Sequence, residues 1–308
     1  MKKKITIIGA GNVGATAAHW ALARKLGNIV LLDVMEGIPQ GKALDLWQSG
    51  PLDSYAGTVT GSNDYADSAD SDVVIISAGL ARKPGMSRDE LLAKNVAIVK
   101  SCAEQAVKHS PNCFMIVVTN PIDAMVHTAF KVSGLDKSRI IGMAGVLDTA
   151  RYRTFLADAI GVAPADVNAL VMGIHGDKML PMVRLANVGG VPITELLTEE
   201  KIAEIVKRTQ VGGMEIVNHL KTGSAFFTPG LAAVEMAEAV LNDSKRVMPC
   251  AAYLEGEFGI DGYFLGVPVV LGDKGVERIL DFELTEDEKT ALEDSVAAVS
   301  KQMEATGL

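Results

Sequence analysis

Aromatic residues make up only 5% of the 308-residue chain, so its core must be built mainly from Ala, Val, Ile, Leu and Met. Cysteine is also scarce. The chain has three cysteines, Cys102, Cys113 and Cys250. Because their number is odd and their spacing is not that of a metal site, they argue against a disulfide framework and favour a reducing compartment. We expect each of them to be a small, buried, apolar side chain.

Long hydrophobic runs and an excess of positive charge are missing as well. No segment approaches the roughly 18 apolar residues of a membrane span. Lys and Arg total 29 against 38 Asp and Glu, and the net charge of −9 argues against nucleic-acid or anionic-membrane partners, but not against a local basic pocket. Residues 1–15 are basic and then apolar, but Gly and Asn interrupt them too early for a secretion signal. We therefore expect a cytoplasmic protein without a metal site.

The first half of the chain alternates apolar runs with amphipathic stretches. Strands rich in Val, Ile and Leu are expected at residues 4–9, 28–33, 71–77, 114–120 and 138–143. Helices are expected between them, at residues 12–25, 40–48, 89–109 and 121–133. This alternation predicts an α/β fold with a Rossmann-type, doubly wound parallel sheet, which binds ligands beyond the carboxyl ends of its strands.

The second half has a different pattern. Helices are expected near residues 147–160, 199–220, 228–241 and 284–305, and strand-like segments at 166–177 and 182–193. The glycine-punctuated segment 247–280 is typical of antiparallel strands. We therefore predict a dinucleotide-binding domain at residues 1–145, packed closely against a mixed α+β substrate-binding and catalytic domain at residues 146–308.

The first predicted strand ends in GAGNVG, a GxGxxG spacing that is typical of dinucleotide-binding loops between a strand and a helix. Gly9 permits the tight turn, Gly11 lets a pyrophosphate approach the backbone, and Gly14 lets the helix pack closely. The helix N-terminus offers free N–H groups to the phosphates. The glycines alone would also suit an ordinary strand–helix turn. The residues expected to contact the cofactor here are Gly9, Ala10, Gly11, Asn12, Val13 and Gly14.

Asp33 ends the next predicted strand, 19 residues after Gly14. A carboxylate at this place can accept hydrogen bonds from the adenosine ribose, and it repels the 2′-phosphate of NADP. An exposed loop acid is the alternative interpretation. Together with the glycine loop, Asp33 predicts NAD as the cofactor.

Polar residues also fall where such a sheet would place a catalytic site. Asn120 follows a strand, and Asp148 and Arg151 lie three residues apart on one helix face. His175 follows an apolar segment and has glycines on both sides. Each has a plainer alternative: a helix cap for Asn120, a surface ion pair for Asp148 with Arg151, and a structural role for the histidine. Arg153 lies on a different face, and for it we expect only a surface ion pair.

Residues 79–88, GLARKPGMSR, follow a buried strand and have no helical or strand pattern of their own. They contain Arg82 and Arg88, two permanently charged anion binders. Such a loop at the carboxyl end of a strand needs a functional explanation.

These stretches together resemble the lactate/malate dehydrogenase family over essentially the whole chain, and in particular its lactate-dehydrogenase-like malate dehydrogenases. The stretches that carry the resemblance are GAGNVG, LLDV, AGLARKPGMSRDELLAKN, VVTNP, GVLDTARYR and IHGD.

The resemblance implies a role for each polar residue. His175 would be the general base, and Asp148 would fix its tautomer and favour the imidazolium. Arg151 would bind the substrate's C1 carboxylate with its planar guanidinium group. Asn120 would contact both the substrate and the cofactor ribose. Further cofactor contacts are implied for Asn95, Val118 and Thr119.

The resemblance also explains residues 79–88 as a lid that closes over the substrate and excludes water. Arg88 would polarise the reacting carbonyl group. Arg82 matches a position that contacts the far end of the substrate, where lactate dehydrogenases typically carry glutamine. A second carboxylate needs a cation there and a methyl group does not, so Arg82 favours malate and oxaloacetate. A solvated lid charge is the alternative for Arg82.

The implied activity is reversible, NAD-dependent oxidation of (S)-malate to oxaloacetate, a step of the tricarboxylic acid cycle. A lactate or broad 2-hydroxy acid dehydrogenase is the nearest alternative, and a non-catalytic nicotinamide-sensing domain is the alternative from another class. The family also implies a homodimer or homotetramer. The helix around residues 42–48 has an apolar face that suits such an interface, or equally burial within its own domain.

Overall fold

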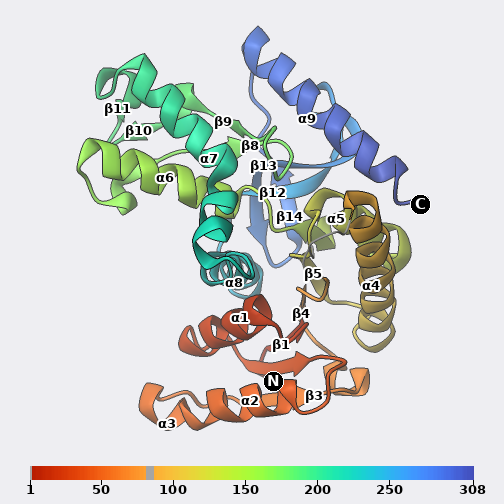
Figure 1. Ribbon diagram of the computed structural model, residues 1–308. Helices are drawn as coiled ribbons and strands as arrows, with labels where there is room; N and C mark the ends of the chain where they lie inside the picture. Colours follow the sequence, from red (N-terminus) through yellow and green to blue (C-terminus); the bar gives the residue numbers. More distant parts are fainter. Residues whose placement is uncertain (1, 81–86) are drawn as a thin grey trace.

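The structure is a computed structural model that describes residues 2–80 and 87–308 (Figure 1). Parallel strands form one side of a nine-stranded sheet, in the order β6-β5-β4-β1-β2-β3. They are β1 (Lys4–Ile8), β2 (Asn28–Leu32), β3 (Val59–Ser62), β4 (Val73–Ile76), β5 (Phe114–Val117) and β6 (Ile140–Gly142). The strand order reverses between β1 and β4, where doubly wound sheets bind ligands. The predicted Rossmann-type α/β fold is confirmed.

Helices pack on both faces of this parallel region. They are α1 (Asn12–Ala23), α2 (Ile38–Gln48), α3 (Gly50–Asp53), α4 (Arg88–His109) and α5 (Ile122–Ser133). α1 packs against α2, and α4 packs against α5 (Figure 1). Because helices cover both faces, β4 and β5 are buried at every residue, as their continuous apolar sequences predict. The surrounding core consists mainly of Ala, Val, Ile, Leu and Met, as the low aromatic content requires.

The second half of the chain extends the same sheet with antiparallel strands. These are β12 (Arg246–Glu255), β13 (Asp261–Gly272) and β14 (Gly275–Ile279), and β12 joins β6 by pairing Ala251 with Gly142. The helices of this half are α6 (Val146–Ile160), α7 (Glu199–Leu220), α8 (Phe227–Leu241) and α9 (Glu286–Glu304). α8 packs on α1, so the two halves meet closely, as expected. A domain division near residue 145 stays a prediction.

The segment before His175 differs from the single strand expected at residues 166–177. It forms two short strands, β7 (Val167–Asn168) and β8 (Val171–Met172), which belong to different sheets. β7 pairs with β10 (Asn187–Val188), which also pairs with β11 (Val191–Pro192), whereas β8 pairs with β9 (Leu180–Pro181). The continuous apolar pattern could not reveal that its two ends have different partners.

Other expectations have mixed outcomes. β3 was not expected from the sequence, because it is short and contains glycine and polar residues. Each cysteine is buried and free, which agrees with the composition. Among the described residues, no helix combines the length and apolarity needed to cross a membrane. The cytoplasmic location stays a prediction.

Candidate active site

Two pockets lie beside the glycine loop at the carboxyl ends of the parallel strands. The first has a volume of about 400 Å³, and Gly9, Gly11 and Asp33 line it together with Ala78 and Leu80. The second has a volume of about 220 Å³, and residues from both halves of the chain line it. Its lining includes Val13, Val118, Asn120, Met143, Leu147, Arg151, His175, Gly213, Val217, Ser224, Ala225 and Pro229. The glycine loop therefore faces both pockets.

The glycine loop is packed so tightly that side chains are excluded at two of its three glycines. Gly9 has a φ of +106°, and a Cβ there would lie 2.6 Å from the Ala78 nitrogen. A Cβ on Gly14 would lie 1.8 Å from the Gly9 carbonyl oxygen. In contrast, among residues 2–80 and 87–308, a Cβ on Gly11 would meet nothing within 4 Å, and no side chain caps the N-terminus of α1. Open space beside uncapped N–H groups fits the pyrophosphate of a dinucleotide.

Asp33 is half-buried at the edge of the first pocket and is held by the backbone around it. Its Oδ2 accepts a hydrogen bond of 2.6 Å from the Ala10 N–H, and its Oδ1 accepts one of 2.9 Å from the Met35 N–H. The Lys42 ammonium donates to the Ala10 carbonyl oxygen at 2.7 Å. Since each carboxylate oxygen can accept more than one hydrogen bond, Asp33 can still bind a ribose from this place.

Three charged side chains meet at the second pocket, although they come from segments far apart in the sequence. The His175 Nδ1 lies 2.8 Å from the Asp148 Oδ2, and the Arg151 Nη1 lies 3.4 Å from the Asp148 Oδ1. Asp148 also accepts a hydrogen bond of 3.3 Å from the Gly145 N–H at the start of α6. Only 2% of the Asp148 side chain is exposed, so its charge is held in a desolvated setting.

Burial and these charges act in opposite directions on the pKa values of the pair. Burial disfavours ionisation of Asp148, but the charges of His175 and Arg151 outweigh it and lower the Asp148 pKa. Burial likewise disfavours the imidazolium, but Asp148 outweighs it and raises the pKa of His175. The Asp148 carboxylate therefore stabilises the protonated imidazole ring of His175. Because Nδ1 contacts Asp148, Nε2 is the ring nitrogen that can exchange a proton with a bound ligand.

Arg151 has room for a second anionic partner. Among the described residues its guanidinium pairs with Asp148 alone, and burial lowers its pKa. The neighbouring helix α7 has glycines at the point of contact. A Cβ on Gly212 would lie 3.3 Å from the Arg151 Cδ, and one on Gly213 would lie 3.6 Å from its Nη2. The glycines let α7 pack closely beside Arg151, which also lines the second pocket, where its planar guanidinium can bind a carboxylate.

The remaining predicted residues take different places. Asn120 and Val118 line the second pocket. Thr119 is buried, and its hydroxyl donates to the Ala78 carbonyl at 2.7 Å. Asn95 is buried, and its side chain bonds the backbone of Leu80 and Asn120. Asn95 thus links Leu80, which lines the first pocket, to Asn120, which lines the second.

Residues 79–88, the segment that contains Arg82 and Arg88, are described only in part. Arg82 lies outside the described residues. Arg88 is the first residue of α4, which Ser87 caps by accepting a hydrogen bond from the Glu90 N–H. The roles expected for both arginines stay predictions.

The sequence did not indicate two features that lie at the second pocket or directly behind it. One is Asp123, whose Oδ2 accepts a hydrogen bond of 3.2 Å from the His175 N–H. Its signal was an acidic residue three positions after Asn120, in the first turn of a helix. The other is the segment from Gly213 to Pro229, which spans the end of α7 and the start of α8. No motif in that segment indicated that it would reach the site.

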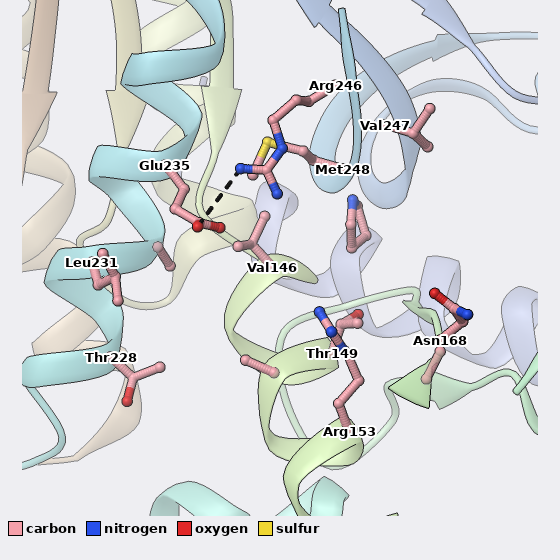
Figure 2. A pocket seen from close by; sticks show the side chains of 14 residues that line it. Val146, Thr149, Arg153, Asn168, Thr228, Leu231, Glu235, Arg246, Val247 and Met248 are labelled. Atoms are coloured by element: carbon pink, nitrogen blue, oxygen red, sulfur yellow. Dashed lines mark ion pairs between the residues drawn. The ribbon is translucent and has the colours of Figure 1, made fainter. Parts of the chain in front are cut away.

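A third pocket, of about 410 Å³, lies outside this arrangement (Figure 2). Figure 2 shows Arg153 beside it, and an ion pair between Arg246 and Glu235 at 3.6 Å crosses its edge. Among the described residues, Arg153 forms no ion pair, although a surface ion pair was expected. Its guanidinium donates instead to the carbonyl oxygens of Pro164 and Ala165, at 3.1 and 3.3 Å.

Comparison with known proteins agrees with this geometry. Residues 3–142 match the family described as lactate/malate dehydrogenase, NAD binding domain, and residues 145–307 match its alpha/beta C-terminal domain. A malate dehydrogenase of Rhodopirellula baltica is 55% identical over 300 residues, which cover 97% of this chain and 95% of that protein.

Solved structures are similar over the whole chain. A malate dehydrogenase from Picrophilus torridus has a TM-score of 0.97 at 47% identity, covering 100% of this chain and 98% of that one. A lactate dehydrogenase from Cryptosporidium parvum, complexed with lactic acid and nicotinamide adenine dinucleotide, has a TM-score of 0.97 at 44% identity, with the same coverage. This chain therefore belongs to the lactate/malate dehydrogenase family and is an NAD-dependent oxidoreductase.

Proposed function

We propose that this enzyme interconverts (S)-malate and oxaloacetate with NAD as cofactor. The observation that carries the proposal is that His175 and Arg151, both paired with Asp148, line one pocket with Val13 and Asn120. A general base and a carboxylate-binding cation thus lie beside the loop that fits the dinucleotide. A non-catalytic nicotinamide-sensing domain has no support, because it would not need His175, Asp148 and Arg151 together, and the relatives named above are dehydrogenases.

The arrangement suits oxidation of a 2-hydroxy acid. NAD bound at the glycine loop and Asp33 would supply the acceptor for the hydride that leaves C2 of the substrate. His175 Nε2 takes the proton of the C2 hydroxyl group, and the electrons of the O–H bond form the carbonyl. Asp148 stabilises the resulting imidazolium through Nδ1, and Arg151 holds the C1 carboxylate in line. Oxaloacetate reduction reverses each step, so it begins with protonated His175.

The choice of malate over lactate rests on Arg82 and on the name of the Rhodopirellula baltica relative, which is a malate dehydrogenase. We propose that Arg82 binds the second carboxylate of malate and that Arg88 polarises the reacting carbonyl. The nearest alternative is a lactate or broad 2-hydroxy acid dehydrogenase, for which glutamine at position 82 would have been the sign.

Steady-state rates test this assignment, with oxaloacetate and pyruvate each measured against NADH and NADPH. The expected preference is for oxaloacetate with NADH. Arg82→Gln should lower kcat/KM for oxaloacetate while sparing pyruvate, so that their ratio falls by about two orders of magnitude. Arg88→Gln is the matched variant, and it should lower kcat for both substrates by about 10²–10³-fold. Equal losses on both substrates for Arg82→Gln would contradict the assignment to malate.

We further propose that two copies of the chain associate through the face formed by α1, α2 and the start of α8. Leu44, Trp47 and Phe227 are exposed there, with 52%, 51% and 69% of their surface accessible. On α2, Leu44 and Trp47 are therefore not buried within their own domain, whereas Ala43 and Leu46 pack against its core. Light scattering during size-exclusion chromatography tests the proposal, since Trp47→Lys should reduce the measured mass. A wild-type monomer would contradict it.

A further inference from the structure

His175 is bound by two carboxylates, of which only Asp148 touches its ring. Asp123 contacts the backbone instead, since its Oδ2 accepts a hydrogen bond of 3.2 Å from the His175 N–H. Asp123 lies in the first turn of α5, after β5, whereas His175 lies after β8. This hydrogen bond therefore joins the helix that follows Asn120 to the segment that carries the general base.

Asp123 is an unusual residue to find at this place. Its side chain is completely buried, and its Oδ1 has no hydrogen-bond partner among the described residues. Burial raises its pKa to about 6, although the charge of His175 opposes that shift. A buried carboxylate that has no positively charged side chain in direct contact is costly, so a packed apolar residue or an amide would be the more stable choice here.

The charges around His175 indicate what the carboxylate does. Asp123 and Asp148 each carry a negative charge when ionised, and Arg151 carries one positive charge. With a neutral imidazole the buried group has a net charge of −1, whereas with the imidazolium it is neutral. Without Asp123 the imidazolium would give a net charge of +1. A desolvated group of charges is most stable near neutrality, so Asp123 favours the imidazolium.

No other described charge substitutes for Asp123. On the segment that carries His175, the nearby charged residues Asp177 and Lys178 are exposed, and Lys178 pairs with Asp294. The remaining described residues that line the pocket with His175 and Arg151 are uncharged.

We propose that Asp123 is a positioning residue for His175, which holds the backbone of the general base by a hydrogen bond and stabilises its protonated form by charge. The inference rests on the proposed function, because it assumes that His175 exchanges a proton with the substrate. Asp123 itself touches neither pocket, so it acts through His175 alone.

Asp123→Asn separates the charge from the hydrogen bond, because the amide oxygen can still accept the His175 N–H. Loss of the charge should lower the pKa of His175 by about one unit. Oxaloacetate reduction, which needs the protonated ring, should then fail at a lower pH than in the wild type. Malate oxidation, which needs the neutral ring, should begin at a lower pH. Profiles of kcat/KM against pH in both directions measure the two shifts.

Structural damage would give a different result, because it lowers both maximum rates without moving either profile along the pH axis. Thr128→Val is the matched control. Thr128 is equally buried on α5, and its hydroxyl donates to the Ala124 carbonyl at 2.8 Å, away from His175. It should leave both profiles in place. Asp123→Ala, which also removes the acceptor, should show the same shift as Asp123→Asn and a further loss of kcat.

The two proposals can fail separately. A wild-type enzyme that does not turn over oxaloacetate with NADH would overturn the proposed function. A wild-type enzyme that turns it over, together with an Asp123→Asn variant whose profiles coincide with the wild type in both directions, would overturn the role of Asp123 alone.

Discussion

The two pockets beside the glycine loop are built by opposite means. The first is defined by backbone: residues 9–14 turn between β1 and α1 so tightly that Gly14 has no room for a Cβ, and Asp33 is held by neighbouring N–H groups. The second is defined by side-chain charge: His175, Asp148 and Arg151 come from distant segments and are held by each other.

This difference indicates how each pocket responds to change. A backbone pocket depends on space, so an added methyl group should damage it, while a lost charge should mostly alter its preference. A charged and desolvated pocket depends on pairing, so removal of one member leaves the others uncompensated. The following predictions test that contrast.

The largest effect is expected when His175, the proposed general base, is replaced. His175→Asn should lower kcat for oxaloacetate by about 10²–10⁴-fold, the usual scale for general acid–base catalysis. The Kd for NADH should stay near the wild-type value, because the glycine loop and Asp33 are unchanged. Stopped-flow turnover and NADH fluorescence titration measure the two quantities. A large loss of NADH binding would show that the pockets are not separable.

The next largest effects are expected from alanine substitutions at Gly14 and Gly11, which lie in the same loop. Gly14→Ala should destabilise the fold by about 1–3 kcal/mol or more, because its Cβ would collide with the Gly9 carbonyl. Gly11→Ala should leave the free energy of unfolding nearly unchanged, since its Cβ meets open space. Its methyl group should instead weaken NADH binding, by about 5- to 150-fold in Kd.

Urea unfolding and NADH titration of both variants separate these outcomes. If Gly11→Ala binds NADH as the wild type does, the pyrophosphate does not approach this part of the loop.

A smaller effect is expected at Asp33. Asp33→Ser removes a ribose acceptor and a charge that repels the 2′-phosphate, so the NADP-to-NAD ratio of kcat/KM should rise by about tenfold or more. The variant also loses the contact with the Ala10 N–H, so its free energy of unfolding should be measured alongside. An unchanged cofactor ratio would make Asp33 an ordinary loop acid.

The smallest effect concerns stability and pH. The pKa of His175 is raised in the folded chain, so its protonation contributes stability that is present below pH 6.5 and is lost as the pH rises through the folded-state pKa. Asp123, with a pKa of about 6, titrates mainly below this window. Urea unfolding of the wild type should therefore show a decrease in stability above pH 6.5 that His175→Asn lacks. Parallel curves for the two proteins would contradict the raised pKa.

Much of the first half could be predicted from the sequence, because its information is local. The strand, turn and helix around residues 9–14 follow each other directly, so spacing alone indicated the loop and its place in the sheet. The apolar runs of β4 and β5 likewise indicated burial on both faces. β3 was missed because a short strand with glycine and polar residues lacks that signal.

The second pocket was harder to predict, because the residues that form it are far apart in the sequence. The sequence offered Asp148, Arg151 and His175 as candidates, but only their resemblance to a known family joined them, since 27 residues separate Asp148 from His175. Asp123 was missed altogether, because one acidic residue in the first turn of a helix is usually a solvated group.

By itself, then, the sequence determined the parallel sheet and the glycine loop, whose residues are neighbours along the chain, and it supplied the chemical groups of the site. The tertiary structure decided which of those groups meet. Burial and charge act only between residues that lie close in space, and the folding of α5, α6 and α7 around His175 brings Asp123, Asp148 and Gly213 to it. The pKa of His175 is raised because Asp148 and Asp123, from two other segments, lie close to it in the folded chain.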